Sequence, residues 1–332
     1  MFSKFHRSPF VRMDMMRTNS KVSICIPTHN RAHLIGECID SCLAQRHPDI
    51  EIVIGDDSAG DATERLIRER YGGDPRIRYA RNRPSLGQAP NVTSLFARAS
   101  GDKILLIHDD DFLLRDGLAR LLAQWERHPD LDAAFGNQYV VDQRSRIDRA
   151  ATRRLNLMFH RRPAAAGLQS QPGRVGLVQM FPNNGWLARA DLVKRIGYDD
   201  SYGSCCDYVF NTRLCLAARR ISYVDDYVSC YRETDVSISR ATRHSMRSAS
   251  LMAWHFVNDL ALPPELEPAR RLALRRLVPI VVSLYARNHE PRTSLAIALG
   301  NLYAYRFGLS PRLYYHLLMM WKGRRGAGAA AR

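Results

Sequence analysis

Hydrophobic and polar positions change their spacing at regular intervals along residues 22–128, which predicts strands and helices in alternation. Short apolar runs, rich in β-branched residues, predict four strands, over residues 22–27, 50–55, 77–80 and 104–107. Apolar residues at helical spacing predict a helix after each strand, over residues 32–46, 61–72, 91–99 and 116–128. Because strands that alternate with helices usually pair in parallel, the pattern predicts an α/β fold. Its sheet is expected to be mixed, mostly parallel and flanked by helices.

The pattern is less regular in the second half of the chain. Residues 142–162 are rich in arginine and have little periodicity, so we expect either a plain exposed loop or a flexible crossing that closes over a ligand. Strand-like segments return at residues 221–224 and 228–231, and helical spacing extends from about Met246 onward. The predicted organisation is a flexible basic segment over residues 1–20, a main domain over residues 21–240 and a helical basic extension over residues 241–332.

Positive charge is concentrated at the two ends of the chain. The formal net charge is +16, of which residues 1–21 carry +4 and residues 268–332 carry +11, leaving +1 for residues 22–267. Basic ends on a near-neutral body favour attachment to an anionic surface over a groove for nucleic acid. We therefore expect no nucleic-acid partner and a membrane-surface contact through residues 268–332. The alternative is that these helices pack on the main domain or on a second subunit, as in a homo-oligomer.

Cysteine usage and apolar segment length bear on the cellular location. The seven cysteines are an odd number without a C-x-x-C pair, as expected for reduced thiols rather than for disulfides or a zinc site. Residues 1–20 lack the apolar core of a signal peptide. The longest apolar run, Leu277 to Ala286, is about half as long as a membrane span. These features predict a cytoplasmic protein, peripheral on the inner face of the plasma membrane.

Acidic residues follow two of the predicted strands at the point where each strand ends. Asp56 and Asp57 follow the second strand, and the run from His108 to Asp111 follows the fourth. In open α/β sheets, ligands bind beyond these carboxyl ends. Three consecutive acids repel one another unless a hard cation such as Mg²⁺ or Mn²⁺ lies among them. Since a nearby carboxylate can also accept the ring N–H of a pyrimidine base, the sequence predicts a nucleotide-sugar site.

Four motifs in order give the chain a resemblance to a known family. They are Val22–Arg31, Val53–Ser58, Leu86–Asn91 with Ala99–Asp102, and His108–Asp110 in the place of an Asp-x-Asp motif. From about Lys21 to Arg240 the sequence resembles the family 2 glycosyltransferases, which implies the GT-A fold and makes residues 21–240 the catalytic domain.

The resemblance implies which residues contact the donor and the metal. The donor nucleotide would contact Pro27, Thr28, Asn30, Arg31, Asp57, Asn91 and Asp109. Among these, Asp57 is expected to read the uracil base. The metal ligands would be Asp110 and His108, and because imidazole replaces the first acid of the motif, Mn²⁺ suits the site better than Mg²⁺.

Further motifs imply a catalytic base and residues near the acceptor. Residues 187–199 resemble the segment before the catalytic acid of the family, and Asp207 then matches that acid as general base. Possible acceptor or sugar contacts are Trp186, Cys206 and Arg232, although for Trp186 the sequence favours a buried core aromatic. Cys206 stands where the family often has glutamate. Tyr231 and Arg232, with Ser237 and Ser239, resemble the Tyr-Arg and serine motif after the last core strand.

The expected function is inverting, metal-dependent transfer of a sugar, most simply from a UDP-sugar, to an acceptor hydroxyl. The family and the basic end suggest a glycan or lipid-linked acceptor in cell-surface polysaccharide or lipid-linked glycan assembly. Two alternatives share the architecture: a noncatalytic membrane-associated subunit of a glycan assembly complex, and a sugar nucleotidyltransferase. A dinucleotide oxidoreductase is disfavoured, because Pro27-Thr28-His29-Asn30 stands where that class has a G-x-G-x-x-G turn.

Overall fold

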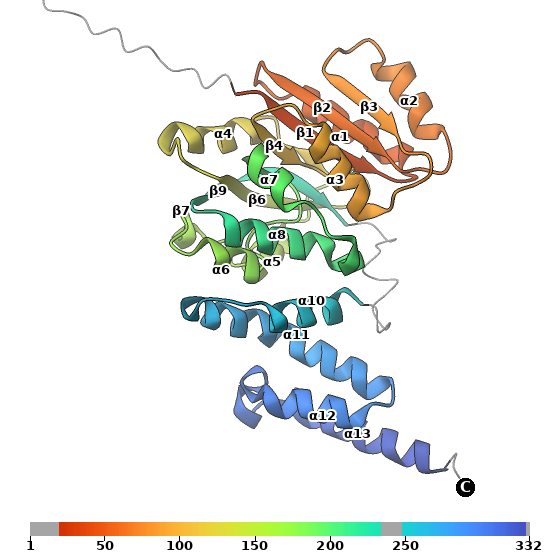
Figure 1. Ribbon diagram of the computed structural model, residues 1–332, viewed down its shortest axis with the longest axis vertical. Helices are drawn as coiled ribbons and strands as arrows, with labels where there is room; N and C mark the ends of the chain where they lie inside the picture. The colour runs from red at the N-terminus through yellow and green to blue at the C-terminus, as the bar shows by residue number, and fades with distance from the viewer. Residues whose placement is uncertain (1–19, 234–247, 330–332) are drawn as a thin grey trace, which may run out of the picture.

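The computed structural model describes residues 20–233 and 248–329, with side chains up to residue 321 (Figure 1). Its first half alternates strands with helices as β1 (Val22–Thr28), α1 (Ala32–Leu43), β2 (Ile50–Asp56), α2 (Ala62–Tyr71), β3 (Ile77–Arg81), α3 (Gln88–Arg98) and β4 (Lys103–Leu106). The four predicted strands and the helices after the first three are confirmed. Helix α3 begins at Gln88, three residues earlier than expected. Gly87, immediately before it, has a positive φ of 90°.

The second half departs from the sequence pattern in several places. Its elements are β5 (Phe112–Leu113), α4 (Gly117–Arg127), β6 (Ala133–Val141), α5 (Arg149–Met158), β7 (Gly167–Leu168), α6 (Pro172–Leu177), β8 (Trp186–Arg189), α7 (Ala190–Ile196), α8 (Cys206–Ala217) and β9 (Ile221–Arg232), with short 3₁₀ turns at Pro163–Ala165 and Asp200–Cys205. Residues 142–162 are not a plain loop, since α5 begins where the Asp148 side chain accepts the N–H of Ala151. The two strand-like segments near residue 225 are one continuous strand, β9.

One sheet joins all the strands, in the order β3-β2-β1-β4-β8-β6-β9-β5, with β7 also paired to β9. Strands β1 to β4 are mutually parallel, and β8 runs antiparallel to both β4 and β6. The expected mixed, mostly parallel sheet flanked by helices is confirmed. In β1, Thr28 lies opposite Asp56 of β2, so these two strands end at the same edge.

Hydrophobic cores lie on both faces of the sheet because side chains of a strand alternate between its faces. In β1, Ile24 and Ile26 pack in one core with Ile35 of α1, whereas Cys25 packs in the other core with Phe96 of α3. All seven cysteines are free and buried, as expected for reduced thiols.

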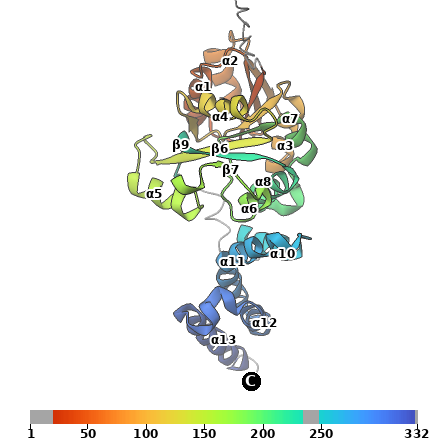
Figure 2. The ribbon, with the colours of Figure 1, turned by 90° about the vertical axis from the view of Figure 1, so that its left-hand side faces the viewer.

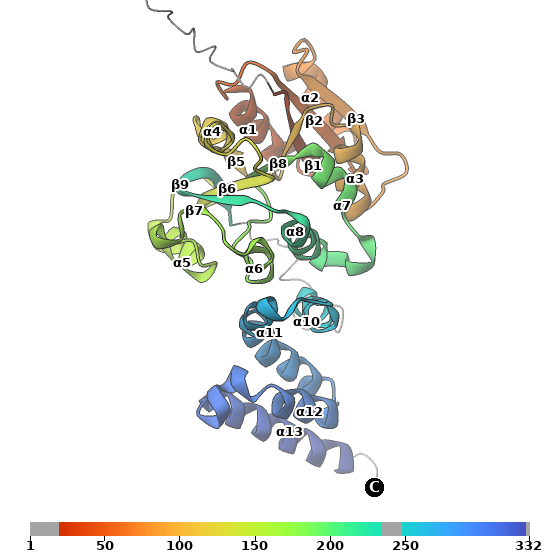
Figure 3. The ribbon, with the colours of Figure 1, turned by 60° about the vertical axis from the view of Figure 1, so that its left-hand side comes forward.

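The C-terminal part is helical: α10 (Ala249–Asp259), α11 (Glu267–Arg287), α12 (Pro291–Gly300) and α13 (Pro311–Ala329), with 3₁₀ turns at Pro264–Leu266 and Leu302–Gly308. Figures 1 and 3 place α10 and α11 directly below α6 and α8 of the sheet domain, and Figure 2 shows α12 and α13 farther away. Val278 of α11 belongs to the same core as Phe210 of α8, so this end packs on the sheet domain. Within the described residues, no helix has the length and hydrophobicity of a membrane span.

Candidate functional site

Two acidic segments meet at the carboxyl edge of the sheet because of strand register. The backbone N–H of Asp57 donates to Thr28 O over 2.9 Å, so the chain beyond β2 stays beside the end of β1. On the other side of β1, Ile107 N donates to Cys25 O over 3.1 Å, which places the following residues, from His108 onward, at the same edge. The shared edge that the sequence predicted is present.

Asp57 is buried and holds the loop between β3 and α3. Its Oδ1 accepts from Asn82 Nδ2 and Leu86 N, and its Oδ2 accepts from the Ser85 hydroxyl and Gly87 N, over 2.6–3.0 Å. Burial raises the pKa of Asp57, but these hydrogen bonds outweigh burial and hold the pKa below its ordinary value. Four donors use the whole acceptor capacity of a carboxylate. A base N–H can therefore bind Asp57 only in place of one of them.

Arg31 bridges the acids that follow β4. One guanidinium nitrogen lies 3.0 Å from Asp109 Oδ1 and 2.7 Å from Asp110 Oδ2, while the Thr28 hydroxyl donates to Asp109 Oδ2 over 2.7 Å. Burial raises the pKa of Asp109 despite these partners. Because Asp109 is only 4% exposed, it lies beneath the site and fixes Arg31 and Thr28.

His108, Asp110 and Asp111 form the candidate metal centre. Their potential ligand atoms all lie within 4.8 Å of one another. Burial, and then the charge of Asp110, raises the pKa of Asp111 to about 7, even though Arg31 pairs with Asp110. Two carboxylates and an imidazole are ligands that Mn²⁺ accepts. These three residues therefore fit a divalent cation. Asn184 lies beside them, with its Nδ2 3.0 Å from His108 Nδ1 and 2.7 Å from Asp111 Oδ2.

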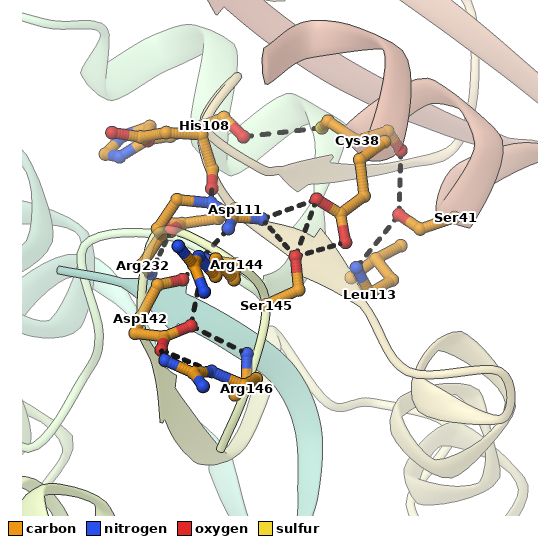
Figure 4. Close-up of polar contacts among 12 residues, drawn as sticks. Cys38, Ser41, His108, Asp111, Leu113, Asp142, Arg144, Ser145, Arg146 and Arg232 are labelled. Carbon is orange, nitrogen blue, oxygen red and sulfur yellow. Dashed lines mark hydrogen bonds and ion pairs between the residues drawn. The ribbon is translucent and has the colours of Figure 1, made fainter. Parts of the chain in front are cut away.

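Arg232 anchors this acidic segment from below (Figure 4). Its backbone N–H donates to Asp111 Oδ1 and its Nε donates to Asp110 O, both over 2.8 Å. The other guanidinium nitrogens donate to Asp142 O and to the Glu37 carboxylate. Since the side chain is only 2% exposed, Arg232 holds the acidic segment after β4 in place, and its contact with acceptor or sugar stays a prediction.

Asp207 lies in the first turn of α8 and is partly exposed. Its Oδ1 accepts the Tyr198 hydroxyl over 2.9 Å, and its Oδ2 lies 3.4 Å from Gln88 Nε2. Gln88 directly follows Gly87, whose N–H binds Asp57. Two consecutive residues at the start of α3 thus link the predicted base-reading acid to the predicted catalytic acid.

The structure buries Trp186 and Cys206. Both side chains are 0% exposed. The indole of Trp186 packs among Phe96, Phe181 and Phe210, which is the core position that the sequence favoured for it. A contact of either side chain with acceptor or sugar stays a prediction.

The remaining predicted donor contacts lie around the same edge. Asn91 is buried, donates to Gly55 O over 2.9 Å and accepts from Asn82, so it supports the Asp57 loop. Pro27 lies opposite Gly55 in the sheet. Asn30 adopts a positive φ of 56° and donates its N–H to the Ser58 hydroxyl. Ser237 and Ser239 lie outside the described residues.

Several site residues were missed from the sequence. Asp111 could have been found, because it is the third acid of one run. Gln88 and Tyr198 lie within motifs described above, but those motifs do not tell that both residues contact Asp207. Asn184 reaches Asp111 because the chain before β8 runs beside the end of β4.

A cleft of about 350 Å³ opens beside Asp207. Its walls come from α6, the start of α8, and helices α10 and α11 of the C-terminal part. Asp207 therefore contacts Gln88 at the start of α3 on one side and lines, on the other, a cavity large enough for part of a substrate.

Residues 23–184 match the model described as Glycosyl transferase family 2. These residues are a family 2 glycosyltransferase domain. The resemblance predicted from the motifs is confirmed. The matched family 2 residues carry Asp57 and the acidic segment after β4, whereas Asp207 lies beyond them.

A curated relative of the family 2 domain is the GalNAc(5)-diNAcBac-PP-undecaprenol beta-1,3-glucosyltransferase of Campylobacter jejuni. It is 34% identical over 104 residues, which cover 31% of this chain and 33% of that protein. Across eight curated relatives, the chain spans only 12–40% of their own length.

Two solved structures share the fold. S. aureus TarS residues 1–349 in complex with UDP-GlcNAc has a TM-score of 0.56 at 17% identity, covering 92% of both chains. The mannosyltransferase PcManGT from Pyrobaculum calidifontis, in complex with GDP-Man and Mn²⁺, has a TM-score of 0.57 at 16% identity, covering 91% of this chain and 87% of that one. At these identities the similarity shows the fold, and the predicted GT-A class is confirmed.

Proposed function

We propose that the protein transfers a sugar from a nucleotide-diphosphate donor, most simply a UDP-sugar, to an acceptor hydroxyl with inversion at the anomeric carbon. The observation that carries this proposal is the link from Asp57 through Gly87 and Gln88 to Asp207. This link supports an arrangement in which the donor site lies on one side of the reacting carbon and the base lies on the other. The TarS complex with UDP-GlcNAc supports the choice of donor class.

Asp207 is the proposed general base. The acceptor oxygen attacks the anomeric carbon while the acceptor hydroxyl proton passes to the Asp207 carboxylate. The bond between the anomeric carbon and the diphosphate breaks, and the nucleoside diphosphate leaves with the bonding electrons. The Tyr198 hydroxyl holds Oδ1 of Asp207, which leaves Oδ2 and its long 3.4 Å contact with Gln88 as the side that faces the acceptor.

Asp57 and Arg31 are the proposed main donor contacts, supported by Pro27, Thr28, Asn30, Asn91 and Asp109. The ring N–H of uracil would replace one of the four donors on Asp57, all of which come from the loop of residues 82–87. Arg31 is about 29% exposed, so its guanidinium can reach a phosphate while Asp109 and Asp110 hold it.

Asp110, His108 and Asp111 would hold Mn²⁺ or Mg²⁺. When bound, the metal supplies positive charge next to the departing diphosphate. PcManGT, which shares the fold, is described with Mn²⁺, and this supports metal dependence.

The proposed setting is lipid-linked glycan or cell-surface polysaccharide assembly at the inner face of the plasma membrane. The name of the Campylobacter relative includes an undecaprenol-linked substrate, which supports a lipid-linked acceptor. Large apolar side chains at the far end of the molecule are exposed, namely Leu299, Phe307, Leu309, Tyr314, Tyr315, Leu318 and Trp321. With exposed Arg292, Arg306 and Arg312 beside them in the sequence, they suit an anionic membrane surface.

The proposal is tested by incubating the purified protein with single nucleotide sugars and Mn²⁺ and measuring the products. Slow release of UDP from one UDP-sugar, accelerated by an acceptor, is the expected result. Release of pyrophosphate or of a sugar 1-phosphate would favour a nucleotidyltransferase instead. No turnover of any donor, with or without acceptor, would favour the noncatalytic subunit.

A further inference from the structure

The cleft beside Asp207 is lined by both basic and apolar side chains. His160, from the turn after α5, and Arg276 of α11 line it together with Asp207. Leu272, Leu277 and Ile280 of α11 line it as well, and Ile280 is 46% exposed. A cleft with this lining suits a ligand that has both a charged and an apolar part.

The positive charge at this cleft lacks a carboxylate partner. The Arg276 guanidinium lies over the ring of Phe159, 5.0 Å from its centroid, and burial lowers the pKa of Arg276. Burial, followed by the charges of Arg174, Arg276 and Arg162, also lowers the pKa of His160. Across residues 20–233 and 248–321, none of these three arginines forms an ion pair. An anion bound here would relieve their mutual repulsion.

Asp207 makes one part of the cleft unfavourable for an anion. Its carboxylate would repel a phosphate placed beside it, whereas a hydroxyl can donate a proton to it. The charges therefore orient a ligand that has its reacting hydroxyl at Asp207 and its anionic group at Arg276 and His160.

We propose that this cleft binds the acceptor, that Arg276 and His160 hold a phosphate group of that acceptor, and that Leu272, Leu277 and Ile280 contact its hydrocarbon chain. The acceptor class is thus a phosphate-bearing, lipid-linked glycan. This inference rests on the proposed function and adds to it that the C-terminal helix α11 selects the acceptor. Arginine forms strong, charge-assisted hydrogen bonds to phosphate.

The test measures binding of farnesyl phosphate to the full chain by calorimetry, without metal and with saturating UDP so that the donor site is filled. Inorganic phosphate and farnesol are the two matched probes, each carrying one half of the proposed ligand. Farnesyl phosphate is expected to bind at least tenfold more tightly than either. R276A is expected to weaken its binding about tenfold or more, as the loss of a charged hydrogen bond predicts, and R276K is expected to restore part of the affinity.

The matched control is R275A, which removes the same charge from the neighbouring exposed position of α11. It should bind farnesyl phosphate within twofold of the wild type. Equal binding by R276A and the wild type, or no binding by the wild type, would overturn the proposal, as would inorganic phosphate binding as tightly as farnesyl phosphate. If thermal unfolding shows that R276A does not fold, the comparison is made with R276K and R276Q instead. UDP-sugar hydrolysis by the wild type is measured separately: its absence would count against the proposed function, whereas the Arg276 dependence of binding tests the cleft.

Discussion

Tyr198 donates its hydroxyl to Asp207 Oδ1 over 2.9 Å from a fully packed position behind the start of α8. The tyrosine ring is stacked 4.6 Å from Phe210 of α8 and lies 5.9 Å from Phe96 of α3, measured between ring centroids. The direction of the Asp207 carboxylate is therefore set by a rigid aromatic cluster rather than by solvent. Tyr198 acts through Asp207, as a positioning residue.

Y198F should lower kcat about tenfold with little change in the donor KM, because a hydrogen bond to a charged group contributes roughly 1.5–3 kcal/mol. Steady-state UDP release checks this. The control is Y71F, which removes a hydroxyl that donates to Asp40 over 2.9 Å, far from the site. Y71F should lose stability and keep kcat. A fall in kcat that is equal in the two variants would remove the positioning role.

D110A should abolish most metal-dependent donor binding, because it deletes one of the carboxylates near His108 and Asp111. UDP affinity is measured by calorimetry with and without Mn²⁺, and the gain from Mn²⁺ should fall by about tenfold or more. D102N, at the exposed residue just before β4, is the control. An unchanged Mn²⁺ requirement in D110A would contradict the metal assignment.

The sequence predicted the parallel half of the sheet because each strand there is a short apolar run that ends in polar residues, as at Thr28 and Asp57. It also predicted that acids meet at one edge, because parallel strands end together. It could not predict the role of Arg232. That side chain looked like an acceptor contact, and only the pairing of β9 with β6 and β5 buries it under Asp110.

The cleft beside Asp207 could not be predicted from the sequence either. Asp207 and Arg276 are far apart in the chain, and they line one cavity because α11 packs against α6 while α10 packs against α8. Basic residues of the C-terminal part suggested a surface role or packing on the main domain, but net charge does not tell which arginine faces a site.

R232A should destabilise the protein by about 3 kcal/mol, because it leaves Asp110 O and Asp142 O without their donor in a buried place. Urea unfolding measures the change. R146A removes an exposed ion pair to Asp142 in the same segment and should cost about 0.5 kcal/mol or less. Similar costs for the two variants would show that Arg232 is not the anchor described above.

Glu51 makes stability depend on pH. Burial raises its pKa, but hydrogen bonds from Ser23, Ser100 and Arg78 outweigh burial and lower the pKa from 4.5 to about 2. A pKa lowered in the folded state contributes stability that is complete above the unfolded value and disappears as the pH falls from about 4.5 to about 2.

E51Q should therefore lose about 2 kcal/mol of unfolding free energy at pH 7, and the difference from wild type should shrink at pH 3. Urea titrations at the two pH values measure it. The exposed E69Q serves as control. A difference that does not depend on pH would show that the loss comes from packing and not from charge.

The exposed apolar end should bind membranes. A variant with F307S and L309S, which changes side chains that are 79% and 83% exposed, should sediment less with vesicles of phosphatidylglycerol than the wild type. L157S, exposed on α5 of the sheet domain, is the control. Unchanged sedimentation would contradict the membrane contact, and a wild-type dimer that the double variant abolishes would show that a second copy covers this end.

D207N tests the central claim most directly. The amide keeps the shape of the side chain and cannot take the acceptor proton, so the rate of UDP formation with saturating donor and acceptor should fall by roughly 10²–10⁴-fold. UDP should still bind with an affinity within about threefold of wild type, since Asp57 and the acidic segment after β4 are unchanged. A D207N enzyme that retains most of its turnover would contradict the assignment of Asp207 as the base.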